Sequence, residues 1–494
     1  DHMLFIWDYT DPRGSFYQYD GLDQTIIHAA LVPTRDGVFA ADAKPQYLLL
    51  LSTPIEVVIL AVYYTGPRGD EASSIDIHET GFGVPSDGVN LVRIVGSRSG
   101  RVFMSGADGF LYELQYANTT GWWQTYKTCV KRNRSRKRDR AYHFLLSAVC
   151  ECADPILELL LDSERNILYT LSAASTIQVF DLGADGEALR YVCSLDIRSL
   201  YHALKQEGAG RDSRPLKKLW EDIRASDKAE ANKGVEREVL SALVGLFPIP
   251  CGASHHAQLV AVSHSGVRIF IRSVLPQEPH AKRLAPYGIK PLFAVAPPLP
   301  SDGAPLRCSR GAVLCAADVF ILATTSDEQQ GGVELLCVSD LAMPRPADDA
   351  ANRPETDRAS VSRPRLSGGL YAVAEELSSD GAYKYELAEQ HARPPRTFVL
   401  LSSEGVQRIR KRRPLELLLA SCSTAPSLPL EGLRSPISDF FAFYGADEAS
   451  AMCLMAAIAT GTNAMQAQRL ATFASQLGGS QPLENVQPLG GTVH

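Results

Sequence analysis

The residue types that carry catalysis are scattered along this sequence rather than gathered in motifs. His255, His256 and His264 lie near one another, but we predict a loop for the first two and a hairpin turn for the third. We therefore interpret all three as solvent-facing. The segment GPRG at residues 66–69 lacks the lysine and the spacing of a phosphate-binding loop. We predict no catalytic residue and no cofactor, and we expect that the protein is not an enzyme.

The cysteines do not form a recognisable metal motif. Ten of them lie between Cys129 and Cys453, and no two form a CxxC pair. Cys150 and Cys152 are two residues apart, which places both on one face of a strand. A structural zinc site needs a second pair of ligands at a suitable spacing, and the sequence has none. We interpret the cysteines as free thiols in a reducing compartment and predict no metal site.

Positive charge is concentrated in one segment of an otherwise acidic chain. The formal net charge of −7 argues against nucleic acid as the main partner of the whole surface. A basic run is nevertheless a candidate contact for phosphate groups of anionic lipid or nucleic acid, or a nuclear import signal. A solvated loop is the alternative interpretation. The basic run consists of Lys131, Arg132, Arg134, Arg136, Lys137, Arg138 and Arg140.

A long insertion over residues 196–247 has helical character. Apolar side chains recur at helical spacing between residues 216 and 223, and a second apolar segment follows at Val239–Phe247. Two interpretations stay open: helices that pack back on the fold, or an in-plane membrane helix in the second segment. The membrane interpretation predicts that Leu243→Asp leaves the fold intact and weakens vesicle binding. The candidate membrane contacts are Val239, Leu240, Leu243, Leu246 and Phe247.

These segments interrupt a repeated unit that Gly100–Tyr116 represents most clearly. Its sequence, GRVFMSGADGFLYELQY, contains an apolar strand, a turn with glycine where a left-handed backbone is needed, and a return strand. One hairpin is only marginally stable alone, so its recurrence is the stronger signal. We predict seven hairpins, within Met3–Tyr19, Tyr47–Tyr63, Gly100–Tyr116, Asn166–Leu182, Gln258–Ile271, Val319–Val338 and Thr397–Arg410.

The repeat predicts a fold that is mainly β with a C-terminal α region. Four short strands per repeat, taken seven times over about 400 residues, match a seven-bladed β-propeller. A pair of β-sandwiches is the alternative, but the recurring strand–Ser-x-Gly–strand form favours the propeller. We assign the propeller to residues 1–413, with the helical insertion at 196–247 and a disordered loop at 340–369.

The sequence changes character after residue 413. Consecutive helices without strands are predicted over residues 414–494, and they look like the first helices of an α-helical solenoid. No apolar run reaches the length of a membrane-spanning helix. We expect the chain to be part of a longer protein. The predicted helices cover residues 414–420, 435–444, 447–460 and 463–477.

Several segments, taken together, resemble one family closely. The resemblance runs nearly end to end, and although each segment alone is a weak signal, their combination is specific. They resemble the nucleoporin-155/170 family, large propeller-plus-solenoid scaffold proteins of the inner ring of the nuclear pore. The segments include MLFIW from Met3, DPILELLLDSERNILYTLSAASTIQVFDLG from Asp154, QLVAVSHSGVRIF from Gln258, FVLLSSEGVQRIRKRRPLELLL from Phe398 and GADEASAMCLMAAIA from Gly445.

The resemblance implies a structural protein of the nuclear pore complex at the nuclear envelope, supporting transport of protein and mRNA. The implied partners are other inner-ring and adaptor nucleoporins, with no specific nucleic acid and no small-molecule substrate. It also implies peripheral contact with the pore membrane through an amphipathic motif in a propeller loop. The insertion departs from that motif because it is heavily charged from Lys205 to Arg237, and only Val239–Phe247 keeps the apolar character.

Two other functions remain as alternatives. One is a scaffold of vesicle-coat type, which shares the propeller-plus-solenoid architecture. The other is a ligand-binding or enzymatic propeller that uses its central channel. Polar and titratable residues gathered at the channel mouth would favour the second alternative.

Overall fold

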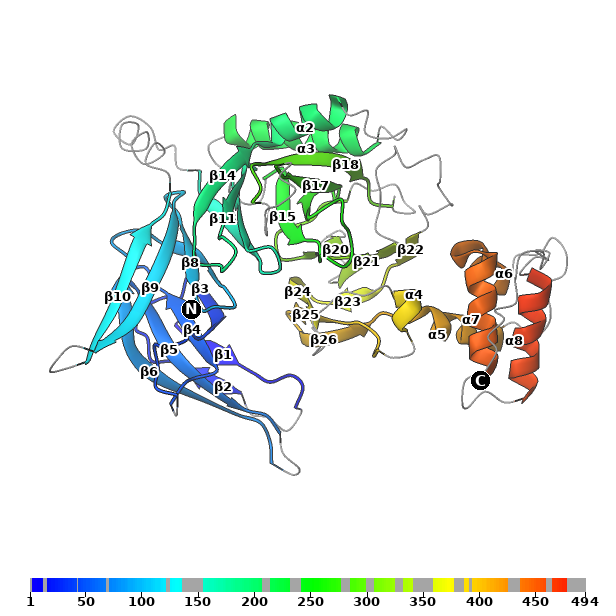
Figure 1. The fold of residues 1–494 in the computed structure, drawn as a ribbon, viewed down its shortest axis with the longest axis horizontal. Coiled ribbons are helices and arrows are strands. Elements are labelled where there is room, and N and C mark those ends of the chain that lie inside the picture. The colour runs from blue at the N-terminus through cyan, green and yellow to red at the C-terminus, as the bar shows by residue number, and fades with distance from the viewer. Residues whose placement is uncertain are drawn as a thin grey trace, which may run out of the picture.

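The computed structural model contains six sheets of three or more antiparallel strands among its described residues, arranged around a common centre (Figure 1). The first strand of each sheet contacts the first strand of the next, in the order β3, β7, β11, β15, β19 and β24. This arrangement is a β-propeller. The described residues are 2–11, 16–41, 43–67, 71–120, 125–135, 154–206, 214–231, 241–276, 285–298, 306–324, 332–340, 359–376, 386–390, 393–424, 436–458 and 464–477.

The first three of these sheets contain four strands each, and every neighbouring pair is antiparallel. The first consists of β3 (His28–Pro33), β4 (Tyr47–Ser52), β5 (Glu56–Thr65) and β6 (Ser74–Pro85). The second consists of β7 (Leu91–Gly96), β8 (Val102–Gly106), β9 (Leu111–Thr120) and β10 (Thr125–Asn133). The third consists of β11 (Ile156–Asp162), β12 (Ile167–Ser172), β13 (Ile177–Asp181) and β14 (Arg190–Leu195).

The last three sheets vary in strand number. The fourth consists of β15 (Leu243–Pro248), β16 (Leu259–Ser263), β17 (Arg268–Val274) and β18 (Gly288–Val295). The fifth consists of β19 (Val313–Ala316), β20 (Val319–Thr324), β21 (Gly332–Asp340), β22 (Ala359–Ser362) and β23 (Arg365–Ser367). The sixth consists of β24 (Leu370–Glu376), β25 (Thr397–Ser402) and β26 (Gly405–Arg410).

All seven predicted hairpins are confirmed as antiparallel strand pairs. The prediction of seven blades is wrong, because the first hairpin does not build a blade. Its strands, β1 (Leu4–Ile6) and β2 (Tyr17–Tyr19), form a separate two-stranded sheet. This small sheet packs on an apolar face of the first four-stranded sheet. The Tyr9 hydroxyl then reaches the Glu376 carboxylate of β24 at 3.5 Å, so the first and last parts of the propeller touch.

Two buried serines each join one blade to the next. Ser52 Oγ donates to the carbonyl oxygen of Leu91 at 2.8 Å, and Ser105 Oγ donates to that of Ile156 at 3.0 Å. In both cases the acceptor lies at the inner strand of the following sheet. Because these side chains are fully buried, each bond satisfies polar groups that water does not reach. Of the serines in the Ser-x-Gly motif that favoured a propeller, Ser105 makes this contact, whereas Ser263 and Ser402 form hydrogen bonds within their own hairpin turns.

The first half of the insertion packs against the propeller, as one of the two interpretations predicted. Helices α2 (Ile197–Gln206) and α3 (Arg214–Ala231) lie over β18 at the outside of the sheets (Figure 1). Leu200, Leu219 and Ile223 are almost completely buried in a core shared with the third and fourth sheets. Lys217, Glu221 and Arg224 face outward, whereas Asp222 is buried and accepts a hydrogen bond from Ser265. A heavily charged segment can therefore still fold onto the domain.

The predicted disordered loop at 340–369 is wrong for its last part. Strands β22 and β23 both pair with β21 and complete the fifth sheet. Residues 341–358 lie outside the described residues. A short strand with few apolar residues has a weak sequence signal, because its pairing with a neighbouring strand is what stabilises it.

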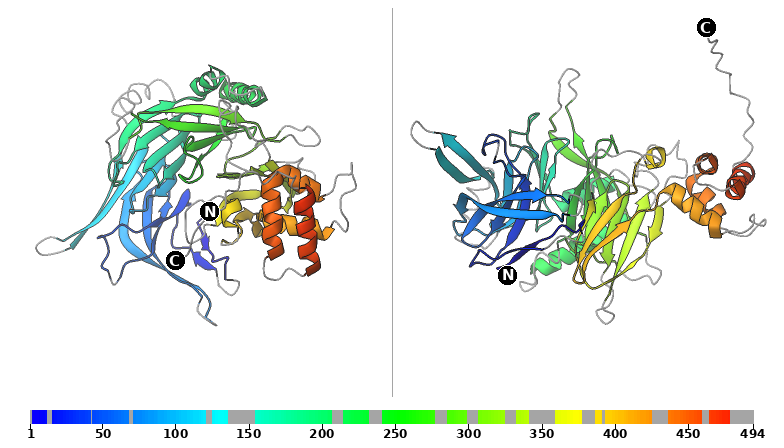
Figure 2. Two further views of the ribbon diagram at one scale, coloured as in Figure 1. Left: turned by 45° about the vertical axis from the view of Figure 1, so that its right-hand side comes forward. Right: turned by 90° about the horizontal axis from the view of Figure 1, so that it is seen from below.

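The predicted C-terminal helices are confirmed with small shifts of their ends, and they form a hydrophobic core of their own. Figure 2 shows these helices, coloured orange to red, beside the last sheet and away from the N-terminal sheets. A one-turn helix, α4 (Glu386–Glu389), lies close to where they begin. In the described part of the chain, no helix is long and apolar enough to cross a bilayer. The C-terminal helices are α5 (Pro414–Thr424), α6 (Pro436–Tyr444), α7 (Ala446–Ile458) and α8 (Ala464–Leu477).

Candidate interaction site

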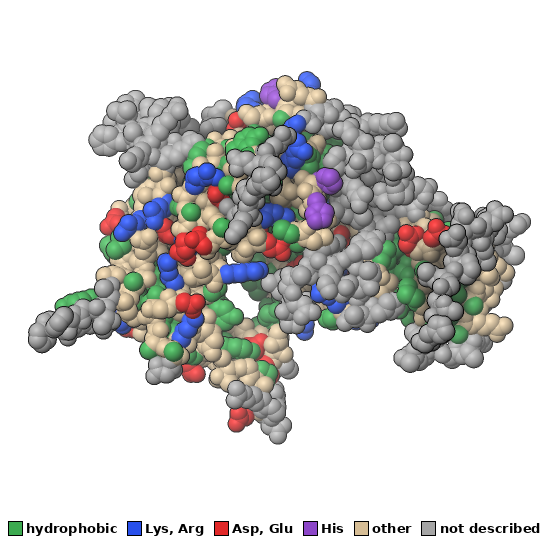
Figure 3. Space-filling model, in the orientation of Figure 1, with side chains coloured by type: hydrophobic (Ala, Val, Ile, Leu, Met, Phe, Trp, Pro, Cys, Tyr) green, Lys and Arg blue, Asp and Glu red, His purple; other side chains and the backbone are tan. Residues whose placement is uncertain are grey.

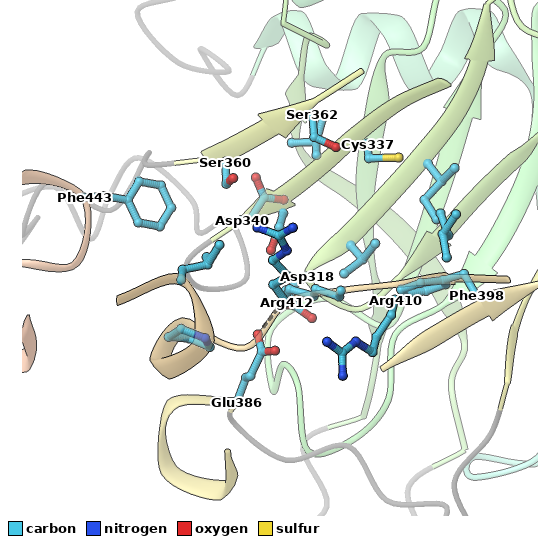
Figure 4. Close-up of a pocket in the computed structure, with 18 of the residues that line it drawn as sticks. Asp318, Cys337, Asp340, Ser360, Ser362, Glu386, Phe398, Arg410, Arg412 and Phe443 are labelled. Atoms are coloured by element: carbon cyan, nitrogen blue, oxygen red, sulfur yellow. Dashed lines mark hydrogen bonds and ion pairs between the residues drawn. The ribbon is translucent and has the colours of Figure 1, made fainter. Parts of the chain in front are cut away.

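A cavity of about 560 Å³ lies where the fifth and sixth sheets meet the C-terminal helices, and we call it the junction pocket (Figure 4). Strands supply one side of it, and helices α4, α5 and α6 supply the other. Its volume falls within the usual range for ligand pockets. The apolar lining consists of Val319, Ile321, Val338, Phe398, Ile409, Leu417 and Phe443.

Ion pairs hold the walls of the junction pocket together. Lys411 Nζ lies 2.7 Å from an Asp318 carboxylate oxygen and 2.5 Å from one of Glu386. Arg396 donates to Asp318 at 2.5 Å and to Glu375 at 2.6 Å. Asp318 belongs to the fifth sheet's hairpin, Arg396 and Glu375 to the sixth sheet, and Glu386 to α4. The network therefore connects two blades and a helix.

Two further arginines lie at the rim of the junction pocket and are weakly engaged. Arg410 is 57% exposed on its side chain and lies 3.6 Å from Glu416. Arg412 is exposed, and no described residue forms an ion pair or hydrogen bond with it. The third lining carboxylate, Asp340, is paired with the buried Arg268 at 2.6 Å. The carboxylates that line the pocket are thus paired with cations, whereas Arg412 at the rim is an unpaired cation among the described residues.

The basic run does not form one surface. Lys131 is nearly buried and pairs with Asp87 at 2.9 Å, with its Nζ over the Tyr112 ring. Arg134 pairs at 2.6 Å with the buried Glu113. Arg132 is exposed, because it points to the opposite face of β10 from its neighbour Lys131. Arg136, Lys137, Arg138 and Arg140 lie outside the described residues, so phosphate contact through them and Arg132 stays a prediction.

In its described part, residues 241–247, the second apolar segment is not a helix. Residues 243–248 form β15, the inner strand of the fourth sheet, and Leu243 and Leu246 are at most 1% exposed. The prediction failed because a short, continuously apolar run fits a buried strand as well as a buried helix. Leu243 and Leu246 are core residues and have no access to a membrane in this fold. Phe247 is partly buried against the neighbouring core, and Val239 and Leu240 lie outside the described residues.

The described residues contain no group of three metal-ligand side chains. His255 and His256 are exposed, as predicted, whereas His264 is partly buried beside Ala242 and Cys308. Burial raises the pKa of the Cys308 and Cys315 thiols to about 12, which leaves them protonated and unreactive. Eight cysteines are free thiols in the structure, and Cys150 and Cys152 lie outside the described residues.

One titratable group that sequence reasoning missed is Glu158 on β11. Burial raises the pKa of its carboxyl to about 7, although Arg310 at 3.7 Å and the Leu246 backbone N–H at 3.2 Å act in the opposite direction. The group therefore titrates near neutral pH. The alternation of β11 is obscured by a register shift beside Glu158, so the sequence pattern did not reveal its environment.

Charge on the visible surface is mixed. On the face drawn in Figure 3, Lys and Arg side chains are interspersed with Asp and Glu rather than gathered in one patch. Such a surface is unlike the continuous positive footprint of proteins that bind nucleic acid along their length. The fold is a propeller with a helical extension, and the junction pocket lies between these two parts.

Comparison with known proteins places this architecture in a family. The nucleoporin N-terminal family model described as "Nup133 N terminal like" matches residues 1–285, which is more than half of the chain. The chain belongs to this nucleoporin family. The resemblance to large scaffold nucleoporins that the sequence motifs indicated is therefore confirmed.

The similar proteins cover nearly the whole chain. A probable nucleoporin, C890.06, of Schizosaccharomyces pombe is 23% identical over 92% of this chain and 35% of its own length. Nucleoporin NUP170 of Chaetomium thermophilum is 25% identical over 94% of this chain and 33% of its own length. This chain thus spans about a third of the length of these relatives.

A solved structure supports the fold independently. The N-terminal domain of Chaetomium thermophilum Nup170, determined in complex with Nup53, aligns with a TM-score of 0.69 at 22% identity. The alignment covers 96% of this chain and 65% of that one. The propeller with attached helices is therefore an architecture that solved proteins share.

Proposed function

We propose that this chain is the propeller-bearing part of a structural scaffold of the nuclear pore complex at the nuclear envelope. The family match over residues 1–285 carries this proposal, and the fold agrees with it. A scaffold needs rigid surfaces rather than reactive groups. The paired side chains and unreactive buried thiols described above suit that role, so we propose a function without enzymatic activity. Membership of a nucleoporin family favours the pore over a vesicle coat.

The partners in this proposal are other nucleoporins. The relative from Chaetomium thermophilum was solved in complex with Nup53, and we propose that this chain also binds an adaptor nucleoporin of that kind. We further propose that α5–α8 begin a longer helical solenoid. Their own hydrophobic core and their position at the edge of the propeller support this continuation.

A localisation experiment tests the proposal. The fluorescently tagged chain should accumulate at the nuclear rim and overlap with a pore marker. Affinity purification after crosslinking should recover other nucleoporins in excess over a tagged, unrelated propeller. Diffuse fluorescence together with no enrichment of nucleoporins would contradict the scaffold role.

Peripheral membrane contact is a separate part of the proposal. Because Leu243 and Leu246 are core residues, we assign the contact to Arg132 and the basic residues at 136–140. Flotation with small anionic vesicles should fail when these residues are changed to glutamine, and it should weaken at high salt. Glutamine at the exposed basic residues Lys217, Arg224 and Lys228 of α3 is the matched control. Flotation on neutral vesicles, or flotation unaffected by the glutamine changes, would rule out this assignment.

A further inference from the structure

We propose that the junction pocket binds a short acidic segment of another protein, which inserts one bulky apolar side chain between the sheets and the helices. This inference rests on the proposed scaffold role, because it names the kind of partner segment that such a scaffold would hold. It differs from that role in assigning the contact to particular residues.

The interior of the junction pocket suits an apolar anchor. Ile321, Val338 and Phe398 are at most 2% exposed and form the floor of the pocket. Ile321 and Phe398 belong to the core of the fifth and sixth sheets. Leu417 of α5 and Phe443 of α6 line the pocket from the helices. Figure 4 shows Phe443 on the opposite side of the pocket from Phe398. A volume of about 560 Å³ accommodates an aromatic or branched side chain with neighbouring backbone. Because the walls are strands and packed helices, the cavity is largely preformed.

The charge of the rim selects the flanking residues of the partner. Asp318 and Glu386 are already paired with Lys411, and Asp340 is paired with Arg268, so a basic ligand finds no free carboxylate pair there. The exposed Arg412 and the loosely paired Arg410 instead offer guanidinium groups to an incoming carboxylate. Arginine binds carboxylates through two parallel hydrogen bonds, which adds direction to the charge.

The strand β22 favours a protein segment over a small molecule. It lies at the end of the fifth sheet, and no described strand pairs with its second edge. Ser360 and Ser362 of this strand line the junction pocket and are exposed. An unpaired strand edge presents backbone N–H and C=O groups that an extended segment satisfies by strand addition. Apolar cavity, cationic rim and open edge are therefore adjacent.

The inference is tested by selecting, from a random peptide library, peptides that bind the intact chain. Two variants alter the junction pocket without touching its core: Arg412→Glu reverses the free charge, and Ser362→Trp fills space from an exposed position. Two matched controls make the same changes elsewhere, Arg98→Glu in the turn between β7 and β8 and Ser74→Trp on β6. Thermal unfolding of all four variants checks that they fold.

We expect the selected peptides to be acidic with one bulky apolar residue. Titration of the strongest peptide by calorimetry should give a Kd at least about tenfold weaker for both pocket variants than for both controls. Added salt should weaken the binding as well. Failure of any peptide to bind, selection of basic peptides, or equal binding to pocket variants and controls would overturn the inference.

Two other occupants give distinct results. If a segment of this chain fills the junction pocket, the pocket variants lower the melting temperature of the free protein and peptides do not bind. If a second copy fills it, sedimentation velocity shows a dimer that the pocket variants dissociate. Either result would overturn the inference while leaving the localisation of the protein at the nuclear rim intact. Loss of localisation with intact peptide binding would instead contradict only the scaffold role.

Discussion

Leu243 illustrates how burial decides the role of a single residue. Its side chain is fully buried at the start of β15, within the core shared by the third and fourth sheets. We expect Leu243→Asp to lower the free energy of unfolding by about 4 kcal/mol or more, because it places an unpaired charge in the core. Urea denaturation measures the change.

The matched control for that substitution is Leu401→Asp on β25. Leu401 is 45% exposed, so an aspartate there keeps its contact with water. We expect a cost of about 1 kcal/mol or less. Equal losses at the two positions would mean that Leu243 is accessible in solution, and the membrane role of that segment would then have to be reconsidered.

Glu158 gives the molecule a dependence on pH. Its pKa is raised from 4.5 to about 7 in the folded state, so folding favours the protonated carboxyl. The stabilising contribution is complete below the unfolded pKa and is lost as pH rises through the folded pKa. We expect Glu158→Gln to become progressively more stable relative to the parent protein as pH rises from about 4.5 to about 7.

Denaturant titrations at several pH values measure this difference. Glu416→Gln is a suitable comparison, because the pKa of Glu416 is lowered and its contribution has the opposite pH dependence. A stability difference between Glu158→Gln and the parent that stays constant across this pH range would show that Glu158 does not titrate there.

At the scale of elements, the hairpin turns set the spacing of the blades. Gly109 has φ of +80°, and a Cβ built on it would lie 2.6 Å from the backbone oxygen of Asp154. Gly88 has φ of +75°, but nothing lies within 4 Å of its added Cβ. The two glycines therefore share the left-handed backbone and differ in their surroundings.

Alanine substitutions at Gly88 and Gly109 separate the energetic cost of backbone strain from the cost of close packing. We expect Gly88→Ala to destabilise the fold by about 1 kcal/mol through strain alone. Gly109→Ala should cost more, because the chain of the following blade must also move. Melting temperatures of the two variants, measured by calorimetry, compare these costs. If both variants lose the same stability, then the contact between the turn and Asp154 does not constrain the blades.

At the scale of the whole molecule, Lys411 connects the propeller to the helices. Its ammonium group bridges Asp318 of the fifth sheet and Glu386 of α4, and its side chain is 14% exposed. We expect Lys411→Ala to destabilise the protein by about 3 kcal/mol, because it leaves a poorly solvated carboxylate without its partner. Arg412→Ala, at an exposed and unpaired neighbour, should change stability by about 0.5 kcal/mol or less.

Limited proteolysis shows where the loss occurs. Cleavage in Lys411→Ala should begin near α4 and α5, since the bridge holds these elements to the sheets. If cleavage instead begins in the N-terminal sheets, then the ion pairs do not hold the junction. Arg412→Ala should be cleaved at the rate of the parent protein.

The sequence by itself determined the local elements of this protein. Alternating apolar residues, glycine-containing turns and helix caps depend only on neighbours along the chain, so the seven hairpins and the C-terminal helices were predictable. Motifs spread over the whole length also identified the family. The serine motif indicated a propeller, although the hydrogen bond from Ser105 to the next blade could not be read from the sequence.

Only the tertiary structure decided which element each segment joins and which side chains it buries. The apolar run at 243–248 became an inner strand, because it pairs with β16 and packs between β11 and β19. Residues 359–367 became strands, because β21 was available to pair with them. The first hairpin remained a two-stranded sheet, since it packs on a neighbouring face instead of extending another sheet. The junction pocket combines residues from 318 to 444, so its chemistry exists only once the sheets and helices meet.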